Sequence, residues 1–138
     1  MGSSRFPDKP LKKIHGMPMV GHCYYRAAMA SGVDKVYVAT CDEEIYDYIL
    51  SIGGGAIMTS ETHIRATTRT AEALQKIEEQ NKEKIDVIIM VQGDEPLIHP
   101  NTIADTIPQF IDPLVNIVNI MSKLETKEAF EDKNNVKV

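Results

Sequence analysis

The residues best suited to chemistry follow a short apolar run. Residues 87–91 are Val, Ile, Ile, Met and Val, and Gln92, Gly93, Asp94, Glu95 and Pro96 come directly after them. The run is rich in β-branched residues, which favours a buried parallel strand covered on both faces. The carboxyl end of such a strand faces the ligand crevice of an α/β sheet. Asp94 is therefore a candidate metal ligand, although a Gly-Asp pair alone also fits a simple polar turn.

A second group of candidates lies at the N-terminus. Residues 2–11 combine small residues, two prolines and two cations, and they show neither a helical nor a strand period. Small residues let backbone N–H groups approach an anion closely, and mobile cations neutralise a polyphosphate. The segment fits a phosphate-binding loop, and a frayed basic tail fits the same composition. The candidate ligands are Gly2, Ser3, Ser4, Arg5 and Lys9.

The elements that must position these groups alternate between helix and strand, which predicts one α/β domain over residues 1–138 with a mainly parallel sheet. Asp42 is expected to cap the second helix, three consecutive glycines to end it, and Pro108 to kink or shorten a later one. The helix over residues 67–81 has a Glu/Lys-rich outer face. Predicted helices cover residues 18–31, 42–52, 67–81, 101–111 and 125–131, and predicted strands cover residues 35–40, 56–59, 85–91, 114–121 and 136–138.

Composition limits the function without naming it. The 138 residues carry a net charge of −5 and no long Lys/Arg stripe, which argues against a nucleic-acid partner. No apolar stretch is long enough for a membrane span or a signal peptide, so a cytoplasmic location is expected. Cys23 and Cys41 fit free thiols. The four histidines lack the spacing of a zinc site.

Several motifs in order and at consistent intervals resemble the 3-deoxy-manno-octulosonate cytidylyltransferase (CMP-Kdo synthetase) family. They are Gly-Ser-Ser-Arg-Phe-Pro-x-Lys-Pro-Leu from Gly2, Gly-Met-Pro-Met from Gly16, Val-Ala-Thr from Val38, Met-Thr-Ser from Met58, and Gln-Gly-Asp-Glu-Pro from Gln92. The resemblance implies a three-layer, Rossmann-like fold of the nucleotide-diphospho-sugar transferase type. It also implies a reaction in which CTP and an acidic eight-carbon keto sugar give CMP-Kdo and pyrophosphate, for lipopolysaccharide biosynthesis.

The same resemblance implies roles for individual residues. Asp94 would hold Mg²⁺, and Gln92 matches the family's sugar-binding glutamine. Lys9 and Asp94 would be the catalytic residues, and Lys9 would neutralise phosphate charge. The remaining nucleotide ligands would be Gly2, Ser3, Ser4, Arg5, Thr67 and Arg69.

The chain also departs from the family pattern. Arg65 replaces a small residue, Thr68 an acid, Cys41 an aspartate, and Asp8 a glycine; Asp8 is expected to point outward. His63 precedes the nucleotide-proximal segment and equally fits a capping or turn role. The family's first apolar strand and its C-terminal portion, with the homodimer interface and a second metal-binding aspartate, have no counterpart in these residues. The chain is therefore expected to be a fragment with an incomplete sheet.

Two alternatives stay open. An enzyme of the same fold acting on another acidic or amino-substituted sugar, or with another nucleotide, is motivated by the altered residues 65–69. A non-catalytic remnant that at most binds nucleotide is motivated by the missing portions.

Overall fold

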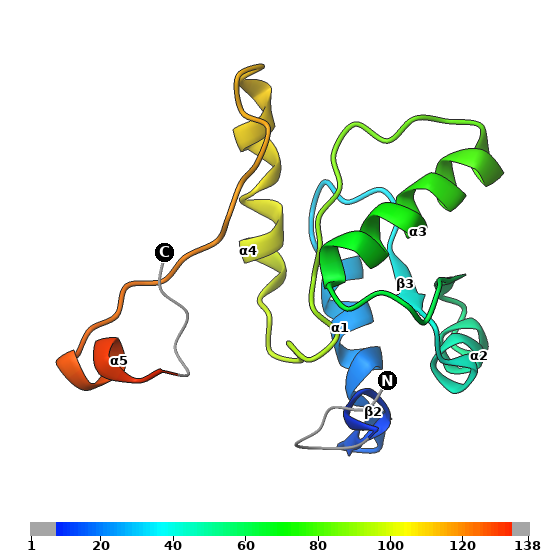
Figure 1. Cartoon of the computed structure of the whole chain (residues 1–138), viewed down its shortest axis with the longest axis horizontal. Helices are drawn as coiled ribbons and strands as arrows, with labels where there is room; N and C mark the ends of the chain where they lie inside the picture. The colour runs from blue at the N-terminus through cyan, green and yellow to red at the C-terminus, as the bar shows by residue number, and fades with distance from the viewer. Residues whose placement is uncertain (1–7, 134–138) are drawn as a thin grey trace.

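The structure, a computed structural model, describes residues 8–133 and shows an α/β arrangement (Figure 1). The predicted strand at residues 136–138 and the candidates Gly2, Ser3, Ser4 and Arg5 lie outside the described residues. In chain order the elements are η1 (Lys9–Leu11), β1 (Lys13–Ile14), β2 (Met17–Pro18), α1 (Met19–Ala28), β3 (Tyr37–Thr40), α2 (Glu43–Ser51), β4 (Gly55–Met58), α3 (Ala66–Asn81), α4 (Pro100–Ala104), η2 (Ile107–Ile111) and α5 (Lys127–Glu131).

A parallel pair of strands, β3 and β4, forms the centre of the fold. Because side chains alternate along a strand, the pair presents two different faces. Val38 and Ala56 pack against a cluster formed by Val20 of α1 and Ile45 and Ile49 of α2. The opposite face packs against α3, where Ile57, Ala73 and Ile77 form a second buried cluster with Tyr37 and Ala39. Helices therefore cover both faces, which confirms the α/β class and the parallel sheet.

The connections follow the predicted turn chemistry. The Asp42 carboxylate accepts hydrogen bonds from the backbone N–H groups of Glu44 (3.0 Å) and Ile45 (3.2 Å), which confirms its role as the N-cap of α2. The helix ends at Ser51, and Gly53 has a φ of +76°, a backbone conformation that glycine adopts without a steric penalty. Gly53 and Gly54 thus lie in the turn between α2 and β4, and Gly55 begins β4.

Residues 85–91 are extended, but the prediction of a strand there is wrong. Among the described residues no ladder includes them, and the two-stranded sheets are β1–β2 and β3–β4. Ile89 and Val91 pack on the cluster of Ala27, Ala30 and Ile103, between α1 and α4. Ile88 and Met90 point the other way and are 45% and 43% exposed. A strand needs a hydrogen-bonding partner as well as β-branched residues, and this segment has no such partner in the described part of the chain.

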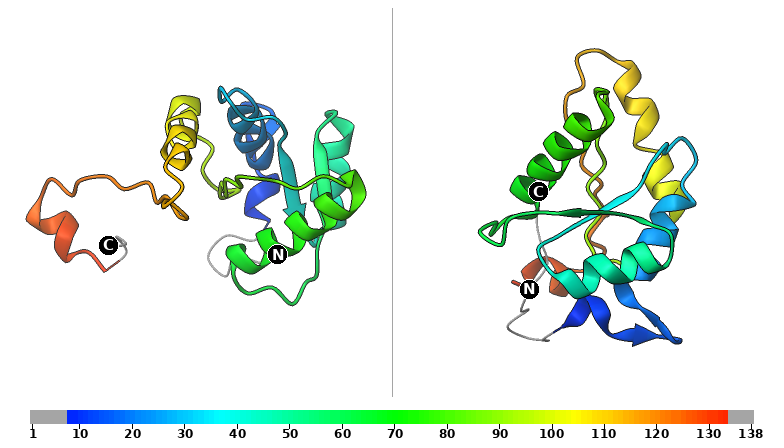
Figure 2. Two further views of the ribbon diagram at one scale, coloured as in Figure 1. Left: turned by 90° about the horizontal axis from the view of Figure 1, so that it is seen from above. Right: turned by 90° about the vertical axis from the view of Figure 1, so that its right-hand side faces the viewer.

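The portion after α4 differs further from the prediction. The expected helix over residues 101–111 is divided into α4 and the 3₁₀ helix η2, because Pro108 cannot donate a helical hydrogen bond. Residues 114–121, predicted as a strand, have no strand assignment. An extended stretch leads to α5, which lies apart from the other helices (Figures 1 and 2). Thr126 caps α5 through a 3.0 Å bond from the Ala129 N–H.

Three short elements near the N-terminus, η1, β1 and β2, were not predicted. Strands β1 and β2 form a short antiparallel hairpin whose turn residues, His15 and Gly16, both have positive φ values of 49° and 85°. Such a pair of values suits a two-residue hairpin turn. Among the described residues, no helix has both the length and the apolar character required to cross a membrane.

Candidate functional site

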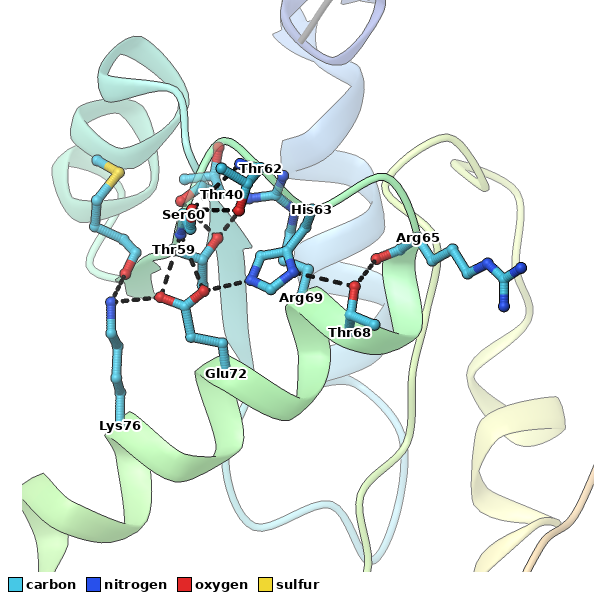
Figure 3. Close-up of polar contacts among 11 residues, drawn as sticks. Thr40, Thr59, Ser60, Thr62, His63, Arg65, Thr68, Arg69, Glu72 and Lys76 are labelled. Carbon is cyan, nitrogen blue, oxygen red and sulfur yellow. Dashed lines mark hydrogen bonds and ion pairs between the residues drawn. The ribbon is translucent and has the colours of Figure 1, made fainter.

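The carboxyl ends of β3 and β4 carry a buried polar contact that involves Arg69. Thr59, directly after β4, donates from its backbone N–H (2.8 Å) and from its hydroxyl (3.1 Å) to the Thr40 carbonyl. The Arg69 guanidinium, on the first turn of α3, donates from Nη1 to the Thr59 hydroxyl (Figure 3). Arg69 is only 7% exposed, and its buried Nη2 atom has no hydrogen-bond partner among the described residues. A buried guanidinium nitrogen without an acceptor is costly, so this position favours a ligand that accepts a hydrogen bond.

Glu72, one turn further along α3, connects the helix to the loop that follows β4. Its carboxylate accepts from the Ser60 backbone N–H at 3.2 and 3.1 Å, from the His63 ring at Nε2, and from Lys76 Nζ at 2.7 Å. Lys76 also donates to the Met58 carbonyl at 2.8 Å, at the end of β4. Hydrogen bonds from Lys76, then His63 and the Ser60 backbone, lower the pKa of Glu72 from its ordinary value of 4.5 to about 2.

His63 joins the same network from the loop. Its Nδ1 atom lies 3.1 Å from the Thr68 hydroxyl, which in turn donates to the Arg65 carbonyl at 3.0 Å. His63 therefore connects the loop after β4 to α3 by hydrogen bonds, which is a turn role of the kind expected from its position. The Arg65 side chain extends away from the network (Figure 3).

Lys9 and Asp94, which are 85 positions apart in the sequence, meet in the folded chain. The Lys9 ammonium donates to Asp94 Oδ2 at 2.8 Å, and both side chains are partly exposed. Asp8, immediately before Lys9, is exposed as expected and has a φ of +55°. This left-handed conformation is one that glycine adopts more readily, and glycine is the residue expected at this position from the family resemblance.

Asp94 is presented by a turn that the Gln92 carbonyl closes, since this carbonyl accepts from the Glu95 N–H at 3.2 Å. The Gln92 side chain is exposed. Cys23 of α1 is buried and contacts the backbone at Glu95; burial raises the pKa of its thiol. Cys23 and Cys41 are both free cysteines, as predicted.

The structure thus brings some predicted residues together and keeps others separate. Lys9 pairs with Asp94, and Thr67 lies exposed on the first turn of α3 next to the Arg69 network. Among the described residues, no hydrogen bond or ion pair joins the Lys9–Asp94 pair to Arg69.

A metal ion at Asp94 would need ligands beyond the protein groups nearby. In residues 8–133 no three His, Cys, Asp or Glu side chains gather in a way that could hold a metal. Mg²⁺ is commonly bound by one or two carboxylates together with substrate phosphates. Asp94, which already attracts the Lys9 cation, fits a single carboxylate of this kind.

Comparisons with known proteins identify the family of this chain. A family model described as cytidylyltransferase matches residues 1–138. The chain belongs to the cytidylyltransferase family. Its relatives include the 3-deoxy-manno-octulosonate cytidylyltransferase of Bradyrhizobium diazoefficiens, which is 42% identical over 128 residues, 93% of this chain and 51% of the relative.

Two further relatives bear on the sugar and on the fold. The 8-amino-3,8-dideoxy-manno-octulosonate cytidylyltransferase of Shewanella frigidimarina is 44% identical over 109 residues, 79% of this chain and 43% of the relative. A solved structure of CMP:2-keto-3-deoxy-manno-octonic acid synthetase complexed with CTP matches with a TM-score of 0.69 and 40% identity, covering 83% of this chain and 45% of that one. The chain thus spans about half the length of the cytidylyltransferases that it matches.

Sequence reasoning missed the roles of Glu72 and Lys76, because both had been included in a solvent-facing Glu/Lys-rich surface of the helix. Their spacing contained a usable signal. Arg69, Glu72 and Lys76 follow an i, i+3, i+7 pattern, which places them on one face of a helix. That face meets the loop after β4.

Proposed function

We propose that this chain is part of a cytidylyltransferase that activates 3-deoxy-D-manno-octulosonate with CTP, giving CMP-Kdo and pyrophosphate. The observation that carries the proposal is Arg69, a buried guanidinium at the carboxyl ends of β3 and β4 whose Nη2 atom has no hydrogen-bond partner in residues 8–133. In α/β proteins that end of a sheet is where nucleotides bind. Membership of the cytidylyltransferase family supports CTP as the nucleotide, and the relatives support the sugar.

The reaction would form one bond and break one. The anomeric hydroxyl oxygen of the sugar attacks the α-phosphorus of CTP, the bond from that phosphorus to the bridging oxygen breaks, pyrophosphate leaves, and the hydroxyl proton passes to solvent. Such a transfer relies on positioning and on charge neutralisation.

Individual residues would share this work. Lys9 would exchange its contact with Asp94 for the phosphates that become pyrophosphate, and Arg69 with Thr67 would bind the nucleoside part. Gln92, exposed beside Asp94, would bind the sugar. Asp94 would hold Mg²⁺, which when bound neutralises phosphate charge. Gly2, Ser3, Ser4 and Arg5 would donate to the phosphates from the N-terminal loop.

The test is sugar-dependent release of pyrophosphate from CTP and Mg²⁺. It is run on this chain and on the same chain joined to the remaining portion of the Bradyrhizobium relative. We expect activity in the joined protein and its loss in Asp94→Asn, whereas the matched Asp86→Asn variant, altered at an exposed carboxylate before the same turn, stays active. An active Asp94→Asn variant would contradict the assigned role, and inactivity of every unmutated version would favour a non-catalytic nucleotide-binding remnant.

A second candidate substrate is the 8-amino analogue of the sugar. The observation that favours it is the 44% identity to a cytidylyltransferase for 8-amino-3,8-dideoxy-manno-octulosonate. Comparing kcat/KM for the two sugars, with CTP and with UTP, separates the candidates. Preference for the 8-amino sugar would replace the first proposal's substrate while leaving its chemistry intact.

A homodimer and a cytoplasmic location belong to the same proposal. The homodimer is implied by the family resemblance, and a reaction that consumes CTP supports the cytoplasmic location. Sedimentation of the joined protein tests the first of them.

A further inference from the structure

Glu72 connects α3 to the loop after β4. Its carboxylate bonds to the Ser60 backbone and to His63, and it forms an ion pair with Lys76, whose ammonium also holds the Met58 carbonyl. The loop between Met58 and His63 is therefore attached to α3 at several points. Figure 3 shows these contacts converging on Glu72 from the loop and the helix.

The donor and acceptor inventory restricts how His63 sits. Glu72 is ionised at neutral pH because its pKa lies near 2, so its oxygens only accept hydrogen bonds. His63 Nε2 must then carry the hydrogen of the bond to Glu72. The remaining ring nitrogen, Nδ1, faces the single hydroxyl of Thr68. Glu72 thus keeps a hydrogen on Nε2 and fixes the orientation of the ring, while the Thr68 hydroxyl donates to the Arg65 carbonyl.

We propose that Glu72 is a positioning residue for the nucleotide: it acts through His63 and the backbone of residues 59–63 to keep Thr59 and Arg69 aligned for CTP. The inference rests on the proposed function, since it assumes that CTP binds at Arg69. Thr59 links the two parts, because it starts this loop and accepts the hydrogen bond from Arg69. A loop released from Glu72 would have to be ordered again when CTP binds, which lowers affinity.

A double-mutant cycle tests the route of this effect. CTP affinity is measured by titration calorimetry for the wild-type chain, Glu72→Gln, His63→Ala and the double variant. We expect Glu72→Gln to weaken binding about tenfold, the loss typical of one good hydrogen bond. The double variant should lose less affinity than the two single losses multiplied together, because the two changes share the Glu72–His63 contact. Independent, multiplying losses would overturn the inference.

Glu79→Gln is the matched control on the same helix. Glu79 is exposed and bonds only to the Gln75 side chain among the described residues, so its change should leave CTP affinity unaltered. A loss as large as that of Glu72→Gln would show a general charge effect on α3 and would overturn the proposal.

A measurement without nucleotide tests the contacts of Glu72 separately from CTP binding. In ¹H–¹⁵N spectra, Glu72→Gln should shift the His63 ring nitrogens and the Ser60 amide, and Glu79→Gln should not. Unmoved signals would overturn the positioning role. Absence of CTP binding by the unmutated joined protein would instead overturn the proposed function, whereas CTP binding that is indifferent to Glu72→Gln overturns this inference alone.

Discussion

Strand β4 and residues 85–91 show how strongly a strand depends on its neighbour. Residues 55–58, Gly-Ala-Ile-Met, have a modest β-propensity but pair in register with β3, from Tyr37 opposite Gly55 to Thr40 opposite Met58. Residues 85–91 are far richer in β-branched types, yet no ladder includes them in the described part of the chain. Whether a strand forms here therefore depends more on a neighbouring backbone to pair with than on the β-propensity of the residues.

The two regions also differ in their polar contacts. The end of β4 is connected to β3 and α3 through Thr59, Glu72 and Lys76. The turn after residues 85–91 is connected to the N-terminal part of the chain by the Lys9–Asp94 ion pair between half-exposed groups. Exposed pairs of this kind contribute little to stability. The β4 end thus has a fixed geometry, whereas the Asp94 turn can exchange its partner.

The largest expected difference concerns hydrogen exchange. Ladder amides of β3 and β4 should exchange only through global unfolding, which costs about 5–15 kcal/mol in typical domains, whereas residues 87–91 should exchange through openings near zero cost. Native-state exchange followed by NMR measures both. Equal protection of the two segments would show that residues 87–91 have a ladder partner in solution, and the comparison would fail.

A pair of truncations should show the same contrast in stability. Ile49 of α2 is fully buried in a cluster with Val20 of α1, whereas Ile88 is 45% exposed. Ile49→Ala should cost about 3 kcal/mol through lost burial and the cavity left behind, and Ile88→Ala less than about 1 kcal/mol. Urea unfolding followed by circular dichroism gives both values. A larger cost at Ile88 would indicate that its exposed face is covered in solution.

The smallest expected effect is on acid stability at the β4 end. Folding lowers the Glu72 pKa from 4.5 to about 2, so its stabilising contribution is complete above pH 4.5 and disappears as the pH falls toward 2. Glu72→Gln should therefore flatten the decline in unfolding free energy across this window. Glu79→Gln serves as the control. An unchanged slope in Glu72→Gln would show that the network with His63 and Lys76 does not persist in solution.

Much of the packed region was predictable because local signals and tertiary contacts agree there. Asp42 could be identified as a cap from its position, and the glycine run as a turn, because each acts within a few residues. The helix containing Arg69 was likewise expected within one residue of its start. Residues 85–91 and 114–121 were wrongly predicted as strands, because pairing depends on residues distant in the sequence.

The sequence indicated which residues belong to the candidate site, but not the hydrogen bonds and ion pairs between them. Asp94 and Lys9 were separate candidates, and their 2.8 Å contact depends on folding across 85 positions. Glu72 was missed because a glutamate on an amphipathic helix usually faces water, and only the loop after β4 shows that this one does not. The helical spacing from Arg69 to Lys76 suggested a shared face without saying what it meets.

The most direct test of the central claim is a CTP titration of the isotope-labelled chain followed by NMR. We expect signals of Thr59, His63 and the Arg69 side chain to shift with CTP, together with those of Lys9 and Asp94 when Mg²⁺ is present, while residues 114–121 stay unchanged. Shifts confined to other parts of the chain, or none at saturating CTP, would contradict a nucleotide site at the ends of β3 and β4.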